Sequence, residues 1–288
     1  MRFRLRRGAL LMLLASVAFS LMAASVRACK GRIPFFEVAF FRSFVALVPV
    51  LVSLWLRRIP LRTSRPGLML SRGLAGFASM ALYFYGLTHL HLADSVMLGA
   101  TAPIFVALLA PFALGEMMRA PVAVAISISV GGLFLLVGPS LEVGNLGGIA
   151  AAASGATASV AYIAIRKLSA TEHPDVIVFG FTAIATVLSA VAMVPSFLVP
   201  EGVEWLLLVG AGIFAAVGQA LITRAYAIEE AAVASALSYA TVLFSWLIGV
   251  GIFDEPVSPR AILGGLVLVA VGTYLGFARG AASPPSRF

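Results

Sequence analysis

Long apolar stretches follow one another along the whole chain, separated only by short polar joints. A window of about 19 residues, the length of helix that crosses a bilayer, divides the chain into ten such segments. The predicted spans are Gly8–Val26, Phe35–Leu56, Leu70–Leu87, Ala93–Leu114, Pro121–Gly138, Leu146–Ile165, Val176–Val194, Trp205–Ala225, Ala231–Phe253 and Ala261–Phe277. Segments of this length and apolarity predict an all-α integral membrane protein with ten transmembrane helices.

The composition excludes a water-soluble fold. Hydrophobic residues make up 61% of the chain, charged residues only 11%, and the mean hydropathy is +1.05. Ten spans of roughly 20 residues use about 200 positions of the chain, so the joints are too short for an extramembrane domain. We therefore expect the function to lie inside the membrane or at its two faces.

The second half of the chain repeats the first at an offset of 139 residues. At this offset Ser20 meets Ser159, Arg27 meets Arg166 and Glu116 meets Glu255, and the stretch FVALLAPFALGE overlies FSWLIGVGIFDE. These matches predict two five-helix repeats, residues 1–140 and 141–288. Because five is an odd number, the second repeat begins on the opposite side of the bilayer and is inverted. Inverted repeats are a recurrent architecture of secondary transporters.

Basic residues follow membrane topology rather than forming a nucleic-acid-binding patch, although the net charge is +8. With the N-terminus in the cytoplasm, the outer joints hold only Arg27, Lys30, Arg32 and Arg260. The inner joints hold Arg2, Arg4, Arg6, Arg7, Arg57, Arg58, Arg62, Arg65, Arg72, Arg119, Arg166, Lys167, Arg224, Arg279 and Arg287. This bias obeys the positive-inside rule. We expect an inner (plasma) membrane protein with both termini cytoplasmic and an uncleaved first span.

The sequence offers no group of residues typical of an enzyme or a metalloprotein. One cysteine and three histidines are too few for a disulfide or a clear metal site, and no nucleotide-binding loop is present. We therefore expect no catalytic residues, metal or cofactor. No aspartate or glutamate lies at the centre of a predicted span, so we expect facilitated diffusion or exchange rather than proton coupling through a buried carboxylate.

The ten spans, the two repeats and the joints after the fourth and ninth spans resemble the EamA-type branch of the drug/metabolite transporter superfamily. The segments that carry this resemblance are Ala102–Gly138 and Ser238–Gly276. The family's pattern there is an apolar span, a small residue and then Glu, a short turn and a Gly-containing span. The resemblance implies export of a small metabolite by alternating access. The many aromatic residues make this chain similar to the amino-acid exporters of that branch, including exporters of aromatic amino acids.

Polar residues inside the predicted spans are the candidate substrate-binding groups, because an unsatisfied polar group in a membrane costs free energy. Ser79 and Tyr83 share one helix face, Gln219 and Thr223 share another, and Ser238 adjoins Tyr239. The predicted substrate-binding residues are Ser79, Tyr83, Tyr162, Gln219, Thr223, Ser238 and Tyr239. The serines also fit simple hydrogen bonds to their own helix, and the tyrosines fit packing or interface positions.

Two further polar features leave alternatives open. Arg42 lies within the second span and suits contact with a substrate anion, but snorkelling to the outer interface or pairing with Glu37 is the favoured interpretation. The outer joint with His89, His91 and Asp94 suits a proton relay or gate, although a solvated loop is the favoured interpretation.

Cargo and class also remain open at this stage. Drugs, nucleosides or other metabolites are alternative substrates, and an intramembrane enzyme is the alternative of another class. The expected partners are a small-molecule substrate and the lipid bilayer, with no nucleic acid, and the protein is expected to be a monomer or a homodimer.

The topology leads to a direct prediction. A cysteine introduced as Glu142→Cys lies in the joint between the two repeats and should react with a membrane-impermeant thiol reagent only from outside the cell. Labelling of this position only from the cytoplasmic face would contradict ten spans with cytoplasmic termini. Labelling of an Arg62→Cys variant, in an inner joint, provides the control of opposite sidedness.

Overall fold

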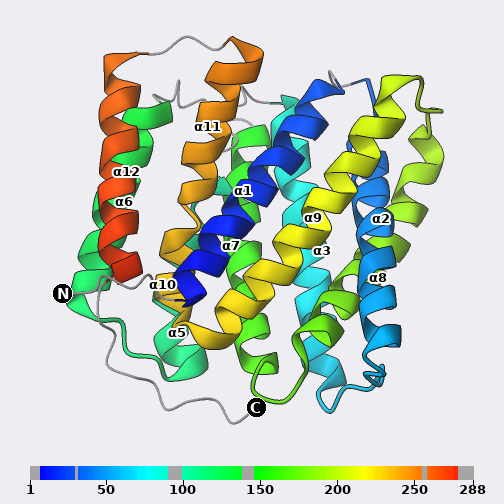
Figure 1. Ribbon diagram of the computed structural model, residues 1–288, viewed down its shortest axis with the longest axis horizontal. Helices are drawn as coiled ribbons and strands as arrows, with labels where there is room; N and C mark the ends of the chain where they lie inside the picture. Colours follow the sequence, from blue (N-terminus) through cyan, green and yellow to red (C-terminus); the bar gives the residue numbers. More distant parts are fainter. Residues whose placement is uncertain (1–6, 30–31, 90–98, 138–145, 255–257, 278–288) are drawn as a thin grey trace.

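The computed structural model describes residues 7–29, 32–89, 99–137, 146–254 and 258–277. Within these ranges the protein is helical, with short turns and no strand. The long helices stand side by side in one bundle (Figure 1). The α-helices are α1 (Arg7–Ala28), α2 (Phe35–Leu56), α3 (Pro66–His89), α5 (Ala102–Leu114), α6 (Ala120–Val137), α7 (Leu146–Leu168), α8 (Pro174–Met193), α9 (Val203–Ile228), α10 (Ala231–Leu237), α11 (Ala240–Phe253) and α12 (Pro259–Phe277).

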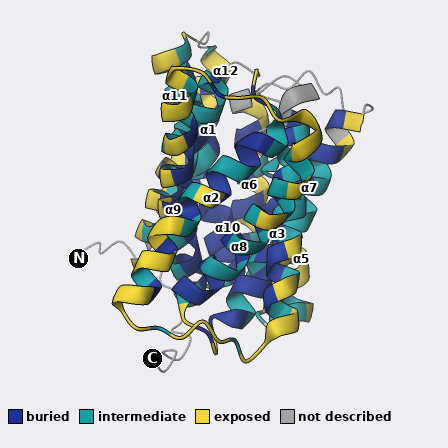
Figure 2. Ribbon diagram, turned by 90° about the vertical axis from the view of Figure 1, so that its right-hand side faces the viewer, coloured by how far each residue is buried: buried dark blue, intermediate teal, exposed yellow. Residues whose placement is uncertain are grey.

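The helices have the length and composition of a multi-pass membrane protein. Among the described residues, six helical segments are long and apolar enough to cross a bilayer, and three shorter apolar helices accompany them. Helix α3 has the length but is less apolar, because it carries a polar face described below. Large apolar side chains such as Trp55, Phe112 and Val191 are exposed on the outside of the bundle (Figure 2). Such a surface is suited to lipid rather than water.

The observed helices follow most predicted spans but differ at two of them. The ninth predicted span is interrupted, since α10 ends at Leu237 and α11 begins at Ala240. The fourth span has a turn at Ala100 and Thr101 before α5 begins. The two turns lie at equivalent places, because an offset of 139 residues carries Ala100 onto Tyr239. Pro103 therefore lies in the first turn of α5, where a proline fits without kinking the helix.

Contacts between helices repeat with the same symmetry as the sequence. The most extensive pairs are α1 with α9 and α3 with α7, and these are exchanged when each span is replaced by its counterpart in the other half. The pairs α2 with α9 and α3 with α8 are exchanged in the same way. The pairs α2 with α8 and α6 with α12 each join a span to its own counterpart. Most of the packing is therefore between the two halves rather than within one.

Small residues allow the halves to approach closely. A Cβ atom on Gly155 of α7 would lie 2.1 Å from the Thr101 hydroxyl, so this glycine is needed where α7 crosses the turn that precedes α5. Gly218 of α9 is similarly covered by the Phe19 ring of α1. Gly272 of α12, by contrast, has open space in front of it. Close approach of small residues stabilises helix pairs in lipid, where no hydrophobic effect drives them together.

Candidate functional site

A cavity of about 230 Å³ lies between the two halves of the bundle. Residues of α1, α2, α3, α5, α7, α8, α9 and α11 line it, as do the turns at Ala100 and Ser238. Its wall is mostly apolar and aromatic, with a small number of polar groups. This combination is typical of small-molecule sites, and the volume is close to the lower end of their usual range of about 300–1,000 Å³.

Five of the seven predicted site residues line this cavity, namely Ser79, Tyr83, Tyr162, Gln219 and Ser238. The hydroxyl of Ser79 donates to the backbone carbonyl oxygen of Ser154 across the α3–α7 contact (2.9 Å), and that of Ser238 donates to Ser235 (2.6 Å). Both serine hydroxyls therefore already donate hydrogen bonds to backbone carbonyl oxygens. The ring of Tyr162 stacks on that of Tyr226, with centroids 5.0 Å apart.

The other two predicted residues, Thr223 and Tyr239, do not line the cavity. Thr223 is completely buried within the helix bundle. Tyr239 packs into an apolar cluster with Leu133, Val242 and Leu268, of which only Val242 lines the cavity. Tyr239, which lies in the turn between α10 and α11, is therefore not among the described residues that line the cavity.

The structure places Arg42 in the cavity and not at the outer interface that the favoured sequence interpretation gave it. Its side chain is only 6% exposed and lines the cavity. Its Nε and Nη1 atoms point to the sulfur atoms of Met22 (3.0 Å) and Met80 (2.8 Å). It neither snorkels outward nor pairs with Glu37, whose carboxylate accepts from the Leu198 backbone N–H (3.0 Å). The helix α2 turns Arg42 inward because its outward face is occupied by exposed apolar residues such as Phe44 and Val48.

Arg72 is a cavity residue that the sequence interpretation missed, since it was counted as part of a cytoplasmic joint. Helix α3 begins at Pro66, so Arg72 lies almost two turns inside and is 2% exposed. Its Nη2 donates to Gln219 Oε1 (3.1 Å), and its guanidinium carbon lies 4.2 Å from the centre of the Phe181 ring. A helical pattern was available to find it. Arg72, Gly76, Ser79 and Tyr83 recur at intervals of three and four residues and all line the cavity.

The cavity is strongly electropositive. Arg42 and Arg72 are its two charged residues among the lining positions that the structure describes, and no aspartate or glutamate stands with them. The sulfur of methionine is a weak acceptor, and Gln219 provides a neutral oxygen. Neither compensates the positive charge, so the cavity is suited to an anionic ligand.

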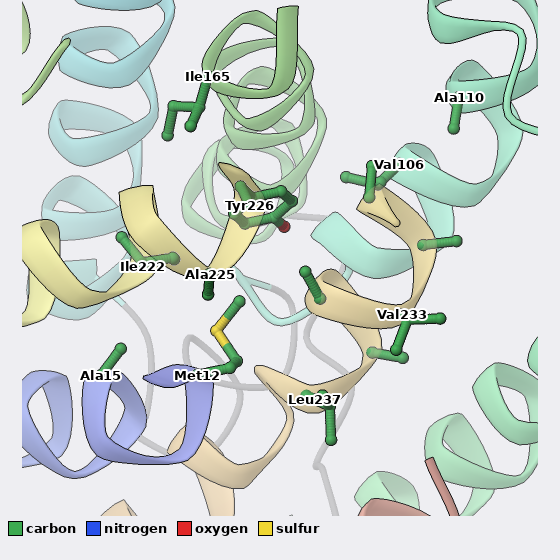
Figure 3. Packing of buried hydrophobic residues seen from close by; sticks show 14 of the residues in the cluster. Met12, Ala15, Val106, Ala110, Ile165, Ile222, Ala225, Tyr226, Val233 and Leu237 are labelled. Carbon is green, nitrogen blue, oxygen red and sulfur yellow. The ribbon is translucent and has the colours of Figure 1, made fainter. Parts of the chain in front are cut away.

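An apolar plug closes the cavity at the end of the bundle that the charge pattern predicts to be cytoplasmic, called here the inner end. Met12, Ile165, Tyr226, Val106 and Leu237, from five different helices, pack there with almost no exposed surface (Figure 3). These apolar side chains separate the polar part of the cavity from the ion pairs at the inner face.

Ion pairs hold the inner end together below the plug. Glu116 accepts from Arg166 Nε (2.7 Å) and from the Ala231 backbone N–H at the start of α10 (2.8 Å). Arg166 also donates to the carbonyl oxygens of Tyr226 (3.3 Å) and Ala227 (3.0 Å) at the end of α9. One acidic and one basic side chain thus connect the ends of α5, α7 and α9 to α10, across both halves.

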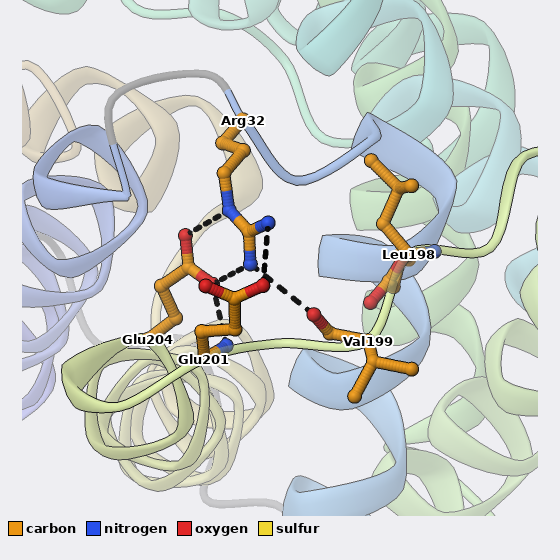
Figure 4. A network of polar contacts seen from close by, with 6 residues as sticks. Arg32, Leu198, Val199, Glu201 and Glu204 are labelled. Carbon is orange, nitrogen blue, oxygen red and sulfur yellow. Dashed lines mark hydrogen bonds and ion pairs between the residues drawn. The ribbon is translucent and has the colours of Figure 1, made fainter.

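The opposite end has its own connection between the halves. Arg32 forms a two-point contact with Glu204 and also reaches Glu201 (3.3 Å) and the Val199 carbonyl oxygen (3.2 Å), as Figure 4 shows. Hydrogen bonding to Glu204 raises the pKa of Arg32 above its ordinary value. This network is exposed to solvent, so it contributes little to stability and can be broken at low cost.

The expected polar joint with His89, His91 and Asp94 lies almost wholly outside what the structure describes. His91 and Asp94 are not described, nor is the side chain of His89 at the end of α3. Within the described part of the chain, no group of three or more His, Cys, Asp or Glu side chains is placed to hold a metal ion.

Similar proteins agree in fold and class. A crystal structure of another protein superposes with a TM-score of 0.80, covers 95% of this chain and 99% of the other, and is 22% identical, which supports the fold alone. The pseudopaline exporter CntI of Pseudomonas aeruginosa is 35% identical over 92% of this chain and 94% of its own. The riboflavin transporter of Vibrio cholerae is 26% identical, with 91% and 90% covered. An S-adenosylmethionine uptake transporter of Rickettsia conorii is also 26% identical, with 85% and 83% covered.

The sequence profile of the EamA-like transporter family matches this chain twice, at residues 6–138 and 145–277. The two matches begin 139 residues apart, which is the offset found from the matching charged residues. Together they cover nearly all of the chain, including every described residue of the cavity. The chain therefore belongs to the EamA-like transporter family and is a multi-pass membrane transporter.

Proposed function

We propose that this protein exports a small amino-acid-like metabolite across the inner membrane by alternating access. The observation that carries this proposal is the cavity between the halves, with apolar and aromatic walls and a few polar groups. Transporters built from inverted repeats bind substrate near the bilayer midplane at the interface between the repeats.

The proposed topology has ten spans, cytoplasmic termini and two repeats, residues 1–140 and 141–288. The exchange of helix pairs between the halves supports this arrangement, because a pseudo-twofold axis would relate those pairs. In this topology the closed end, with the plug and the Glu116–Arg166 pair, is cytoplasmic. The other state would open it, and the turns at Ala100 and Tyr239 are natural hinges, since broken helices adjust at low cost.

Export is supported by the relative with the highest identity among those described above, which is an exporter. The riboflavin and S-adenosylmethionine transporters show that cargo varies among similar chains. An amino-acid-like cargo suits this cavity because a guanidinium pairs well with a carboxylate, and aromatic rings such as Phe84 and Phe181 suit an apolar side chain. Drugs and nucleosides do not share a carboxylate as a class, so they match the arginines of the cavity less well.

An intramembrane enzyme is the alternative of another class, and the cavity gives it little support. The described lining has no cysteine, histidine or carboxylate to act as a nucleophile or base beside its serines. We propose a non-enzymatic carrier that acts as a monomer or homodimer, with the small molecule and the bilayer as its partners. Transport of an unchanged, isotope-labelled molecule would distinguish the two classes.

Transport should not require a proton gradient. Proteoliposomes containing the full chain and loaded with labelled L-phenylalanine or L-glutamate should release label down its concentration gradient, because the described cavity holds no carboxylate for proton coupling. Flux should remain within about twofold when a protonophore collapses the pH gradient. Flux that stops under this treatment, despite a standing substrate gradient, would contradict the facilitator mechanism. Empty liposomes provide the control for leakage.

Gln219 should act as a positioning residue for Arg72. In Gln219→Leu the Arg72 guanidinium loses its acceptor, so the KM for a carboxylate substrate should rise about tenfold, as expected for a hydrogen bond to a charged group. Gln219→Glu places a carboxylate beside Arg72 and should weaken carboxylate binding further, because it neutralises the guanidinium. Thr223→Val, one turn further along α9 and outside the cavity, is the matched control. Unchanged kinetics in Gln219→Leu would show that the amide serves packing alone.

A further inference from the structure

The two buried arginines are held separately and from opposite ends of the bundle. Arg42 enters the cavity from the outer part of α2 and rests on Met22 and Met80. Arg72 enters from the inner part of α3 and rests on Gln219 and Phe181. The two guanidinium groups share none of these four partners. The cavity thus contains two guanidinium groups, called here the anchors, each held by its own protein contacts.

Neither anchor is fully satisfied by the protein. The Nε atom of Arg72 is buried and has no hydrogen-bond partner. Arg42 directs its Nε and Nη1 atoms at thioether sulfur atoms, which are weak acceptors. Among the described residues that line the cavity, no acidic side chain is present to neutralise either group. A guanidinium in a low-dielectric environment favours a carboxylate, which it binds through two parallel hydrogen bonds.

The remaining lining indicates what lies between the anchors. Phe19 and Phe84 provide apolar and aromatic surface, and the Ser16 hydroxyl is buried and without a partner. These groups suit an uncharged body with at least one further polar atom. A volume of about 230 Å³ limits that body to the size of a small metabolite in this conformation.

We infer that the transported molecule is a small dicarboxylate with an apolar or aromatic body, one carboxylate for Arg42 and the other for Arg72. This inference rests on the proposed function, since it concerns the same cavity, and it specifies the substrate class. A single carboxylate leaves one guanidinium without an anion. A cationic substrate meets two like charges. Because each guanidinium has its own contacts, two carboxylates on one molecule give each arginine an anion of its own.

Both arginines belong to the first half of the chain, although both halves shape the cavity. At the repeat offset of 139 residues the counterpart of Arg42 is Phe181, which instead packs against the Arg72 guanidinium. The duplicated scaffold therefore carries an unequal set of charges. The positive charges are therefore placed asymmetrically in the cavity. A substrate with two acidic ends and a distinct side group would bind there in one orientation.

The test compares two probes of nearly equal shape, N-benzoyl-L-glutamate with two carboxylates and N-benzoyl-L-glutamine with one. Binding is measured by isothermal titration calorimetry on the purified full chain in detergent, in chloride-free buffer so that chloride does not occupy the anchors. The dicarboxylate should bind about 10- to 100-fold more tightly, as expected for one additional charge-assisted contact. Equal or weaker binding of the dicarboxylate would overturn the inference.

Variants of Arg42 and Arg72 test whether both arginines are needed for the preference for the dicarboxylate probe. In Arg42→Gln and in Arg72→Gln the preference for the dicarboxylate probe should fall to within about threefold, because each variant keeps only one anchor. Arg62→Gln, which removes an exposed arginine in the loop between α2 and α3, is the matched control and should keep the full preference. A preference that survives in both cavity variants would contradict the assignment. The comparison of the two probes on the unmodified protein decides the question even where a variant fails to fold.

A flux measurement separates this inference from the proposed function. Proteoliposomes that move neither probe, although the dicarboxylate binds with the expected preference, would contradict transport of this class of molecule and leave the binding assignment standing. Proteoliposomes that move the monocarboxylate at least as well as the dicarboxylate would overturn the dicarboxylate assignment and leave the transporter standing.

Discussion

A charged side chain at membrane depth must find a partner, and this constraint shapes the centre of the protein. On insertion scales an arginine at the middle of a membrane helix costs about 2.5–3.5 kcal/mol. Arg42 and Arg72 are both buried in the cavity, and the described lining offers them sulfur atoms, one amide oxygen and an aromatic ring. Gln219, Phe181 and the methionines hold the guanidinium groups in place without neutralising them, so the empty cavity retains a free energy that an anion would release.

The duplication places that cavity and controls access to it. Because most helix packing joins the two halves, a change in how they meet alters both ends of the cavity together. At the inner end the plug around Tyr226 and the Glu116–Arg166 pair join the halves through buried and half-buried contacts. At the outer end the Arg32–Glu204 network is exposed to solvent. Substrate binding must shift these contacts between the halves for transport to proceed.

The sequence predicted the helical spans, the repeat offset and five of the cavity residues, because periodicity and apolar length are local properties. It missed Arg72 because its distance from a span end depends on where α3 begins, and Pro66 starts that helix earlier than hydropathy indicates. It placed Tyr239 on the cavity face because a regular helix was assumed through a position where the chain turns. It assigned Arg42 to the interface because only the packing of α2 against its neighbours shows which side of that helix faces lipid.

The central claim is that the two arginines await an anion and do not serve stability in the empty protein. Thermal unfolding of a double variant, Arg42→Met with Arg72→Met, tests this claim most directly. Replacing uncompensated buried charges by apolar side chains of similar length should leave the unliganded protein at least as stable as the unmodified chain. N-benzoyl-L-glutamate should raise the melting temperature of the unmodified chain and not that of the variant. A variant that melts well below the unmodified chain without ligand would show that the arginines are structural, and would contradict the account.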